Sequence, residues 1–447
     1  MTTIIEQPRY QCALGGALAT ISALPRTSAV IHAAPGCGSS TDTAAALGSG
    51  YWGSTYCNGR ATPSTNTLER EIIFGGEERL SEQLRATFRI IDADLYAVIT
   101  GCMTDIIGDD AASIVRQFRA EGLPVVVAET GGFKGNSAKG HELIWDALID
   151  QYVEKDLPVD PLRVNLLGLI PAQNVFWRGD LIEIKRLLTA LGLKVATFFT
   201  PFDTLDQLRT ASSAGLNIVL SDIHGQGTAA KFQEVHGTPS LTLPVPIGPS
   251  ATREFLEAVA DRFSLKARKT KKVIDEENNH YFAFIQHVAE SYNDLDLQRY
   301  AFVVSDSTYG WALTRFLAHD LGWIPYLTAV TDILTDEEKE RLVGRFDTLA
   351  EAVRPQVVFE TDSSRVIVSA KARIDQEPVN PYGGSPVDPA FVLGSTLDRN
   401  LAAALNAGLL TVSYPVTNRV ITDQGYAGFR GGLRLATDLL SVILSPR

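Results

Sequence analysis

Short apolar runs alternate along the chain with longer stretches in which apolar residues recur every three to four positions. The short runs are mostly apolar throughout, which is typical of strands that are covered on both faces of a parallel sheet. Each run ends at Gly, Pro, Ser, Thr or Asp before the helical pattern begins. This pattern predicts strands at residues 95–100, 125–128, 164–169, 194–199, 218–221, 301–305, 357–360, 365–368 and 409–413.

The intervening stretches predict helices, several of them preceded by a Ser, Thr or Asp that can cap a helix. The clearest are residues 110–121, 180–191, 204–213, 251–262, 310–321 and 396–407. Strand–helix–strand alternation is typical of α/β proteins. A polar break near residues 154–161 and a charged run at 266–279 divide the chain into segments 1–155, 156–280 and 281–447. We therefore expect three doubly wound, Rossmann-like lobes with parallel sheets.

Length and composition agree with a large folded protein. The 447 residues are about three times the length of an average domain, and 45% of them are apolar. The 52 acidic residues outnumber the 40 Lys and Arg, so the net charge of −12 argues against nucleic acid as a partner. The chain has no run of 18 apolar residues and no secretory leader, which predicts a cytoplasmic protein without a membrane partner.

The four cysteines are the strongest chemical signal, because all precede residue 103. Cys12 begins CALGG, Cys37 lies in APGCGSS, Cys57 in TYCNGR and Cys102 in TGCMTDIIGDD. Glycines beside these thiols permit a close approach to a bulky inorganic cluster. Without a C-x-x-C pair a zinc ribbon is disfavoured, and any ligands must converge from separate loops. Thiolates are the usual ligands of iron–sulfur clusters, while the alternative is that each cysteine is a small buried apolar residue.

The segments CALGG, IHAAPGCG, REIIFGGEERL and ITGCMTDIIGDD, in this order, resemble the first lobe of nitrogenase component 1 subunits. The resemblance continues through ETGGFKGNSAKGHE, VNLLGLIP and PVPIGPSATREFL to the C-terminal region, and so covers nearly the whole chain. It implies that Cys12, Cys37 and Cys102 are the iron ligands through which this chain holds its half of an 8Fe–7S P-cluster. Three thiolates of an α-type (D-like) subunit would hold the other half, within an α2β2 heterotetramer.

The resemblance is to β-type (K-like) subunits in particular. Family members that carry the catalytic cofactor use a Cys in the second lobe and a His near the C-terminus, but here no Cys follows Cys102 and the last His is His319. The ending YPVTNRVITDQGYAGFRGG also resembles β-type ends, which suggests that this C-terminal segment contacts the partner. The Gly/Ala/Ser-rich segment after Cys37 and the compact chain are most similar to the K subunit of methylthio-alkane reductase, a nitrogenase-like enzyme.

This resemblance implies an oxidoreductase subunit with no catalytic residue of its own. It would relay electrons from an ATP-hydrolysing iron–sulfur reductase homodimer, which docks transiently, to a catalytic iron–sulfur cofactor in the α-type chain. That cofactor would cleave a C–S bond of methylthio-alkanes, and this chain would bind no nucleotide. The alternatives are a nitrogenase β subunit for dinitrogen reduction, a scaffold for cofactor assembly, and an α/β subunit with inert thiols.

Further residues near the cysteines have two interpretations each. Ser137 in FKGNS is a candidate oxygen ligand of the oxidised cluster, although Asn136 could take that position and a loop Ser is commonly a cap. Cys57 is a candidate ligand or a packed thiol. Five acidic residues can orient cluster loops or, as we favour, cap helices; they are Glu69, Glu71, Asp105, Asp109 and Asp110.

Polar residues elsewhere are weaker candidates. We expect His32, on an apolar strand, to be a hydrogen-bonded core residue rather than a ligand. His224 in SDIHGQG could equally be a hydrogen-bonded core residue or a ligand. Arg419, Arg430 and the loop 425–432 could contact the partner or be solvated. Asp306 in VVSDSTYG could serve a nucleotide site, but no G-x-G-x-x-G or G-x-x-x-x-G-K-[ST] segment accompanies it.

Overall fold

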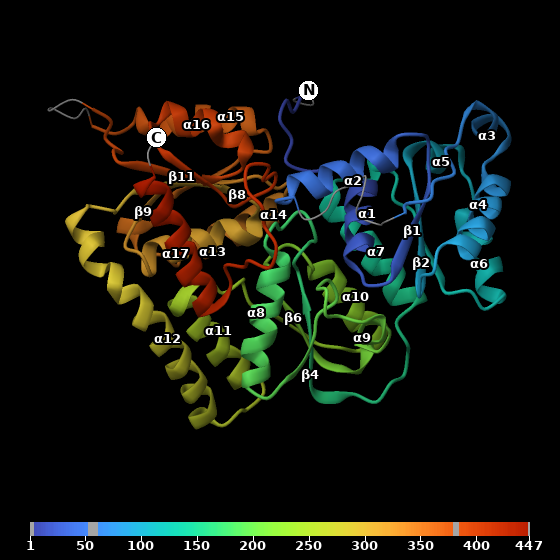
Figure 1. The fold of residues 1–447 in the computed structure, drawn as a ribbon, viewed down its shortest axis with the longest axis horizontal. Helices are drawn as coiled ribbons and strands as arrows, with labels where there is room; N and C mark the ends of the chain where they lie inside the picture. Colours follow the sequence, from blue (N-terminus) through green and yellow to red (C-terminus); the bar gives the residue numbers. More distant parts are fainter. Residues whose placement is uncertain (1–3, 52–60, 379–383, 446–447) are drawn as a thin grey trace.

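The computed structural model describes residues 4–51, 61–378 and 384–445, and these residues form three β-sheets (Figure 1). The first sheet has the strand order β1 (Thr27–His32), β2 (Leu95–Thr100), β3 (Val125–Ala128). The second has the order β5 (Lys194–Ala196), β4 (Asp160–Leu167), β6 (Ala214–Val219), β7 (Ser240–Thr242). The third has the order β10 (Gln356–Phe359), β9 (Ile324–Val330), β8 (Tyr300–Ser305), β11 (Ala390–Gly394), β12 (Gly408–Thr411).

All pairings between neighbouring strands of these sheets are parallel, as predicted. Alternate residues of the first sheet enter different cores: Ile31 and Ile99 pack on one face, and Val30 and Val98 on the other. The helices around this sheet are α1 (Ala13–Ala23), α4 (Glu77–Ile90), α6 (Ala111–Ala120) and α7 (Ser137–Gln151). Burial on both faces explains why these strands are apolar throughout.

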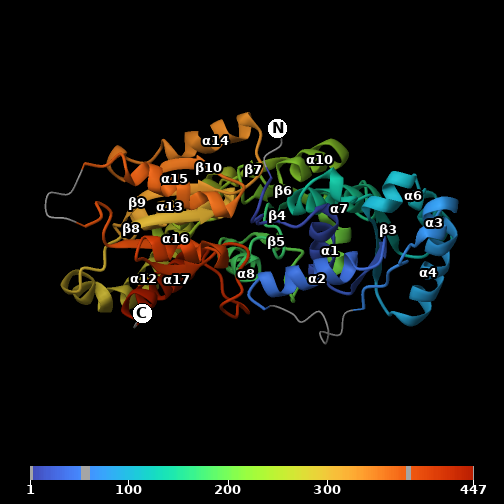
Figure 2. The same ribbon diagram turned by 90° about the horizontal axis from the view of Figure 1, so that it is seen from above.

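Further helices surround the other two sheets, and the first and third sheets lie at opposite ends of the molecule in both views (Figures 1 and 2). These helices are α8 (Trp177–Ala190), α10 (Gln226–His236), α11 (Gly248–Arg262), α12 (Ala267–Asp294), α13 (Ser307–His319), α14 (Asp336–Phe346), α15 (Ser363–Ile374), α16 (Arg399–Ala404) and α17 (Gly428–Leu444). The charged run 266–279 is the first half of α12. Helix α17 returns to pack against α8, α11 and α12.

The strand predicted at residues 365–368 is wrong, because this segment lies inside helix α15. Asp362 caps the helix by accepting a hydrogen bond from the Ser364 amide. Val366 and Ala370 are both fully buried and lie four positions apart, which is the spacing of one helix face. A short run with β-branched residues, such as RVIV, is therefore compatible with a strand or with a helix. The capping residue Asp362 is the sequence signal that favours the helix.

Helices α1 and α7 pack backbone against backbone. A Cβ atom on Gly140 would lie 1.9 Å from the Ala13 carbonyl oxygen, and one on Gly16 would lie 2.0 Å from that of Ser137. Only glycine permits such an approach. Because α1 begins directly after Cys12, this contact also sets the position of that thiol relative to the start of α7.

We expect Gly140→Ala to lower the free energy of unfolding by about 1–3 kcal/mol, since the new methyl group must push two helix backbones apart. Chemical denaturation measures this change. Gly344→Ala is the matched control, because Gly344 lies in the exposed interior of α14, where a Cβ atom would have no neighbouring atom within 4 Å. That substitution should instead stabilise by about 0.5–1 kcal/mol. Equal effects of the two substitutions would contradict the close packing.

His141 joins the same two helices through its ring nitrogens. Its Nε2 accepts a hydrogen bond from the Trp145 indole at 3.1 Å, so its Nδ1 carries the proton and donates to the Thr20 hydroxyl at 2.8 Å. That hydroxyl in turn donates to the Gly16 carbonyl at 2.8 Å. Burial lowers the pKa of His141 to about 3, and the neutral ring is the form that satisfies both partners.

The stability of the protein is therefore expected to depend on pH through His141. Between the ordinary pKa of 6.5 and about 3, the unfolded chain binds a proton that the folded chain excludes. The free energy of unfolding should fall as the pH decreases through this window, by at most about 1.4 kcal/mol per pH unit. Denaturation at a series of pH values should show that the free energy of unfolding of His141→Gln depends less steeply on pH than that of the wild type. An identical slope would show that His141 does not contribute.

Candidate functional site

Each of three cysteines lies at the start of a helix. Cys12 immediately precedes α1, Cys37 is the first residue of α2 (Cys37–Gly48), and Cys102 is the first residue of α5 (Cys102–Ile107). The latter two follow the adjacent parallel strands β1 and β2, whose carboxyl ends meet at one edge of the sheet.

Two of the thiols, those of Cys12 and Cys102, lie beside Gly132. The third, that of Cys37, lies close enough to interact with the charges of both. The Gly132 amide donates a hydrogen bond to the Cys102 Sγ at 3.1 Å. A Cβ atom on Gly132 would lie 3.1 Å from the Cys102 Sγ, 3.2 Å from the Cys12 Cβ and 3.5 Å from the Cys12 Sγ, so a side chain here would crowd the space between the two cysteines. Burial raises the pKa of the Cys37 thiol, and negative charge on Cys102 and Cys12 raises it further. The fold thus brings together three cysteines that are 25 and 65 residues apart.

These thiols are free and accessible: Cys12 and Cys102 are exposed and Cys37 is half-buried. Apolar side chains are exposed beside them. Met103 and Ile106 lie on α5, Phe133 follows Gly132, and Phe74 lies on α3 (Glu69–Phe74), which packs against α5. Exposed thiols within an apolar surface are typical of a site that another protein chain covers.

The donor set fits a cluster of several metal atoms better than a single ion. Within residues 4–51, 61–378 and 384–445, no three His, Cys, Asp or Glu side chains converge closely enough to hold one ion. Thiolates at three helix starts can instead bind different atoms of a larger group, and the glycine at position 132 leaves room between two of them.

Asp105 holds the loop that lies between the thiols. It accepts a hydrogen bond from the Gly131 amide at 3.0 Å and forms an ion pair with Lys134 at 3.1 Å. Lys134 is also paired with Glu129 at 2.8 Å. The loop-orienting interpretation is therefore correct for Asp105.

The other acidic residues have local roles. Asp110 caps α6 by accepting from the Ser113 amide at 2.8 Å, and Glu71 accepts from the Leu68 amide at 2.9 Å at the start of α3, whose first helical residue is Glu69. Asp109 accepts from the Gly76 amide and contacts the His32 Nε2, each at 2.9 Å. His32 is fully buried, and its Nδ1 lies 3.1 Å from the Thr65 hydroxyl. It is a hydrogen-bonded core residue, as predicted.

Asn136, rather than Ser137, caps α7. Its side-chain oxygen accepts from the amides of Ala138 and Lys139 at 3.1 and 3.3 Å. Ser137 is the first residue of the helix, and its buried hydroxyl donates to the Gln173 side chain at 2.9 Å. A ligand role for Ser137 stays a prediction. Cys57 lies outside the described residues.

The C-terminal arginines bind within the chain. Arg419 forms a 2.8 Å ion pair with Asp438 and donates to the Tyr426 hydroxyl at 3.1 Å. The half-exposed Arg430 lies 3.4 Å from Glu277. The loop predicted at 425–432 is correct only for residues 425–427, because residues 428–432 already belong to α17. The Tyr426 and Ala427 amides, just before the helix, donate to the buried Asp180.

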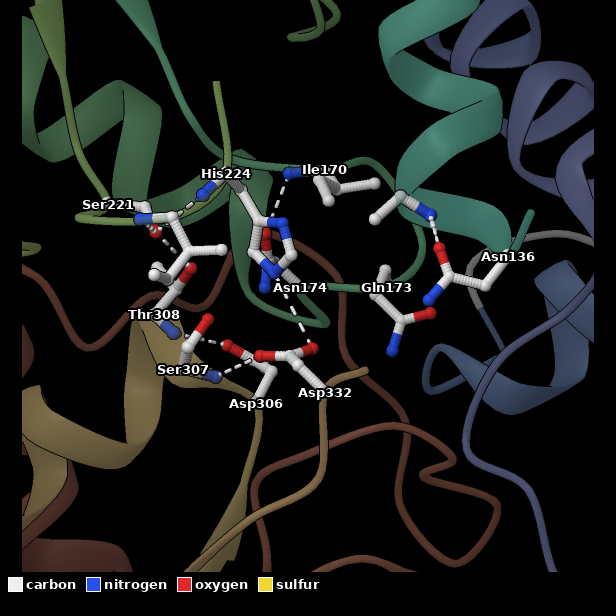
Figure 3. A network of polar contacts seen from close by, with 12 residues as sticks. Asn136, Ile170, Gln173, Asn174, Ser221, His224, Asp306, Ser307, Thr308 and Asp332 are labelled. Atoms are coloured by element: carbon white, nitrogen blue, oxygen red, sulfur yellow. Dashed lines mark hydrogen bonds and ion pairs between the residues drawn. The ribbon is translucent and has the colours of Figure 1, made fainter. Parts of the chain in front are cut away.

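A second group of polar residues lies where loops of the second and third sheets meet (Figure 3). Asp306 follows β8 and caps α13 by accepting from the Thr308 and Tyr309 amides at 2.9 and 3.0 Å. Burial, together with the nearby Asp332, raises the pKa of Asp306 to about 6. The His224 Nε2 lies 3.5 Å from Asp332; although burial opposes its charged form, Asp332 holds the pKa of His224 above its ordinary value.

The fold and the thiol site define a class: a three-sheet α/β protein with cysteines gathered on one exposed surface. Residues 12–444 match the family Nitrogenase component 1 type Oxidoreductase, and the chain belongs to that family. The resemblance drawn from the cysteine motifs is thereby confirmed at the level of the family. In the part of the chain that the structure describes, no helix combines the length and hydropathy needed to span a membrane.

Two curated relatives carry different names. The chain is 30% identical over 311 residues to the nitrogenase iron-molybdenum cofactor biosynthesis protein NifE of Methanococcus maripaludis, an alignment that covers 68% of this chain and only 61% of that protein. It is 22% identical over 465 residues to the nitrogenase molybdenum-iron protein beta chain of Sinorhizobium fredii, covering 98% of this chain and 84% of that one.

A solved structure titled "Nitrogenase Cp1 at pH 6.5" superposes with a TM-score of 0.79 at 19% identity, covering 99% of this chain and 94% of the other. This similarity confirms the predicted three-lobed fold.

Proposed function

We propose that this chain is a β-type subunit of a nitrogenase-like reductase, in which Cys12, Cys37 and Cys102 hold half of an 8Fe–7S P-cluster. The observation that carries this proposal is the proximity of three free thiols from three separate loops, two of them beside Gly132. Three adjacent thiolates repel one another, and bound iron would remove that penalty. When bound, the cluster would pass electrons one at a time.

The partner would be an α-type subunit in an α2β2 heterotetramer. The exposed thiols lack the remaining ligands of such a cluster, and the apolar side chains of Met103, Ile106, Phe133 and Phe74 beside them provide a surface for a second chain. Covering this surface would also exclude water from the cluster, which affects its potential. A separate reductase homodimer would hydrolyse ATP and supply the electrons, while this chain would bind no nucleotide.

The substrate class that we propose is the methylthio-alkanes. Reductive cleavage of such a thioether consumes two electrons and two protons, breaks one C–S bond and releases methanethiol and a hydrocarbon. Within the 447 residues no Cys follows Cys102 and no His follows His319, which supports placing the catalytic cofactor in the partner. The Gly/Ala/Ser-rich segment after Cys37 supports this branch over a nitrogenase β subunit proper, which is the closest alternative.

A cofactor-assembly scaffold is the second candidate function. It is favoured by the 30% identity to the biosynthesis protein NifE, which exceeds the 22% identity to the beta chain, although the former covers less of this chain. A scaffold would use the same thiols to hold a cluster but would transfer a precursor to another protein without turnover.

Co-purification with the natural partner separates these functions. We expect a stable α2β2 complex that, with its reductase and ATP, releases methanethiol from a methylthio-alkane. The matched control omits the reductase and should release none. Ammonia formation from dinitrogen instead would support the nitrogenase alternative, and a complex that only activates another apo-enzyme would support the scaffold. A chain that purifies without iron and without a partner would overturn the proposal.

A further inference from the structure

Two consecutive glycines, Gly131 and Gly132, lie in the loop between strand β3 and helix α7. Both of their amides donate to side chains of helix α5. The Gly131 amide donates to the Asp105 Oδ2 at 3.0 Å, and the Gly132 amide donates to the Cys102 Sγ at 3.1 Å. Cys102 and Asp105 are three positions apart, so they lie on one face of α5. The loop is therefore held to this helix at two successive amides.

The close approach of Asp105 to the loop requires a glycine. A Cβ atom on Gly131 would lie 2.6 Å from the Asp105 Oδ2. Two glycines in a row have more conformational freedom than other residue pairs, so this part of the loop needs an outside restraint to keep one conformation. Asp105 supplies it: its side chain is only 6% exposed, and a hydrogen bond that is shielded from water is stronger than one on the surface.

The elements on either side of the two glycines are fixed. The Thr104 hydroxyl and the Gly101 amide donate to the carbonyl of His32, the last residue of β1, at 2.8 and 2.9 Å, which joins the start of α5 to that strand. The Thr130 amide donates to the Thr100 hydroxyl at 3.0 Å, and its own hydroxyl donates to the Thr100 carbonyl at 2.8 Å. The position of the two glycine amides thus depends on their bonds to α5.

The charge of Asp105 is balanced within the loop. Lys134 lies 3.1 Å from the Asp105 carboxylate, so this carboxylate adds little net negative charge beside the thiols. Its effect on a group bound there would come through the loop that it holds. A hydrogen bond to a ligand sulfur stabilises the more negative, reduced state of an iron–sulfur cluster and so raises its reduction potential. The Gly132 amide is a donor of this kind to Cys102.

We propose that Asp105 is a positioning residue for the cluster. By holding the Gly131 amide, it directs the Gly132 amide at the Cys102 sulfur and thereby keeps the reduction potential of the bound cluster higher than it would otherwise be. This inference rests on the proposed function, because it requires that Cys102 is an iron ligand. Asp105 itself acts only through the loop.

A comparison of Asp105→Ala with Asp105→Asn tests this role. Both variants remove the carboxylate charge, but only asparagine keeps an oxygen that can accept from the Gly131 amide. We expect amide exchange in peptides that cover residues 129–135 to be about tenfold faster in Asp105→Ala than in the wild type, and close to the wild-type rate in Asp105→Asn. Hydrogen–deuterium exchange of the full-length chain, measured by mass spectrometry, gives these rates. Peptides from β1 and β2 should exchange as in the wild type, which would show that the change is local.

The second readout is the midpoint potential of the cluster in the purified complex, from a redox titration followed by EPR spectroscopy. We expect Asp105→Ala to titrate at a more negative potential than Asp105→Asn, since the sulfur loses its hydrogen bond only in the alanine variant. Glu129→Gln is the matched control, because it removes a 65% exposed carboxylate that also pairs with Lys134, while both glycine amides keep their acceptors. Solvent screens that charge, so loop exchange and potential should both stay close to those of the wild type.

The two proposals fail in different ways. Equal potentials for Asp105→Ala and Asp105→Asn in an iron-loaded complex, or unchanged loop exchange in Asp105→Ala, would overturn the positioning role alone. A wild-type complex that holds no iron would overturn the proposed function and, with it, this inference.

Discussion

Replacing Cys12, Cys37 or Cys102 by alanine, one at a time, is expected to remove most of the iron from the purified complex. Each substitution deletes one of three neighbouring thiols of the candidate site, and a cluster with an unfilled ligand position is exposed to solvent and lost. Because the cluster would lie between two chains, we also expect the partner to co-purify less well. Iron analysis and EPR spectroscopy of the complex measure both effects.

The control for this experiment is Cys57→Ala, which removes the fourth thiol of the same segment. We expect it to retain its iron, since Cys57 has no counterpart in the cysteine motifs that carry the family resemblance. Loss of iron from that variant would add Cys57 to the ligands. Unchanged iron in all three of the other variants would refute the metal assignment and leave an α/β subunit with inert thiols.

Replacing Asp398 by asparagine is expected to destabilise the protein by about 3–5 kcal/mol, because it leaves a buried guanidinium without its counter-charge. Arg9 and Asp398 form a 2.5 Å ion pair in which both side chains are 1% exposed. Arg9 also donates to the Ser363 and Ser413 hydroxyls at 2.6 and 3.2 Å. The N-terminal segment is thereby attached to the third sheet, and denaturant titration measures the loss.

Asp92→Asn provides a comparison, since Asp92 pairs with Arg26 on the surface at 3.1 Å and is 91% exposed. Solvent screens such a pair, and no measurable change is expected. A second comparison replaces both buried partners, Arg9→Met with Asp398→Leu, and should recover much of the stability that the single substitution loses. If Asp398→Asn were as harmless as Asp92→Asn, the buried ion pair would not hold the segment in place.

Local sequence patterns were sufficient for much of the α/β framework. The strands at 95–100 and 125–128 were predicted at their observed bounds, because both are short apolar runs limited by turn residues. Strands β1, β7, β9 and β11 were not predicted. A short apolar run does not reveal by itself whether it pairs with another strand, and β7 has only three residues. The same ambiguity produced the wrong strand at 365–368.

By itself, the sequence determined the α/β class and the family, since these follow from local periodicity and from motifs of a few residues. Tertiary structure alone decided that three thiols lie near one another, two of them beside Gly132, that Asp105 holds the loop at Gly131 and that Arg9 pairs with Asp398. The physical reason is that these contacts join residues far apart in the chain, so they depend on strand order and on how closely helices such as α1 and α7 pack.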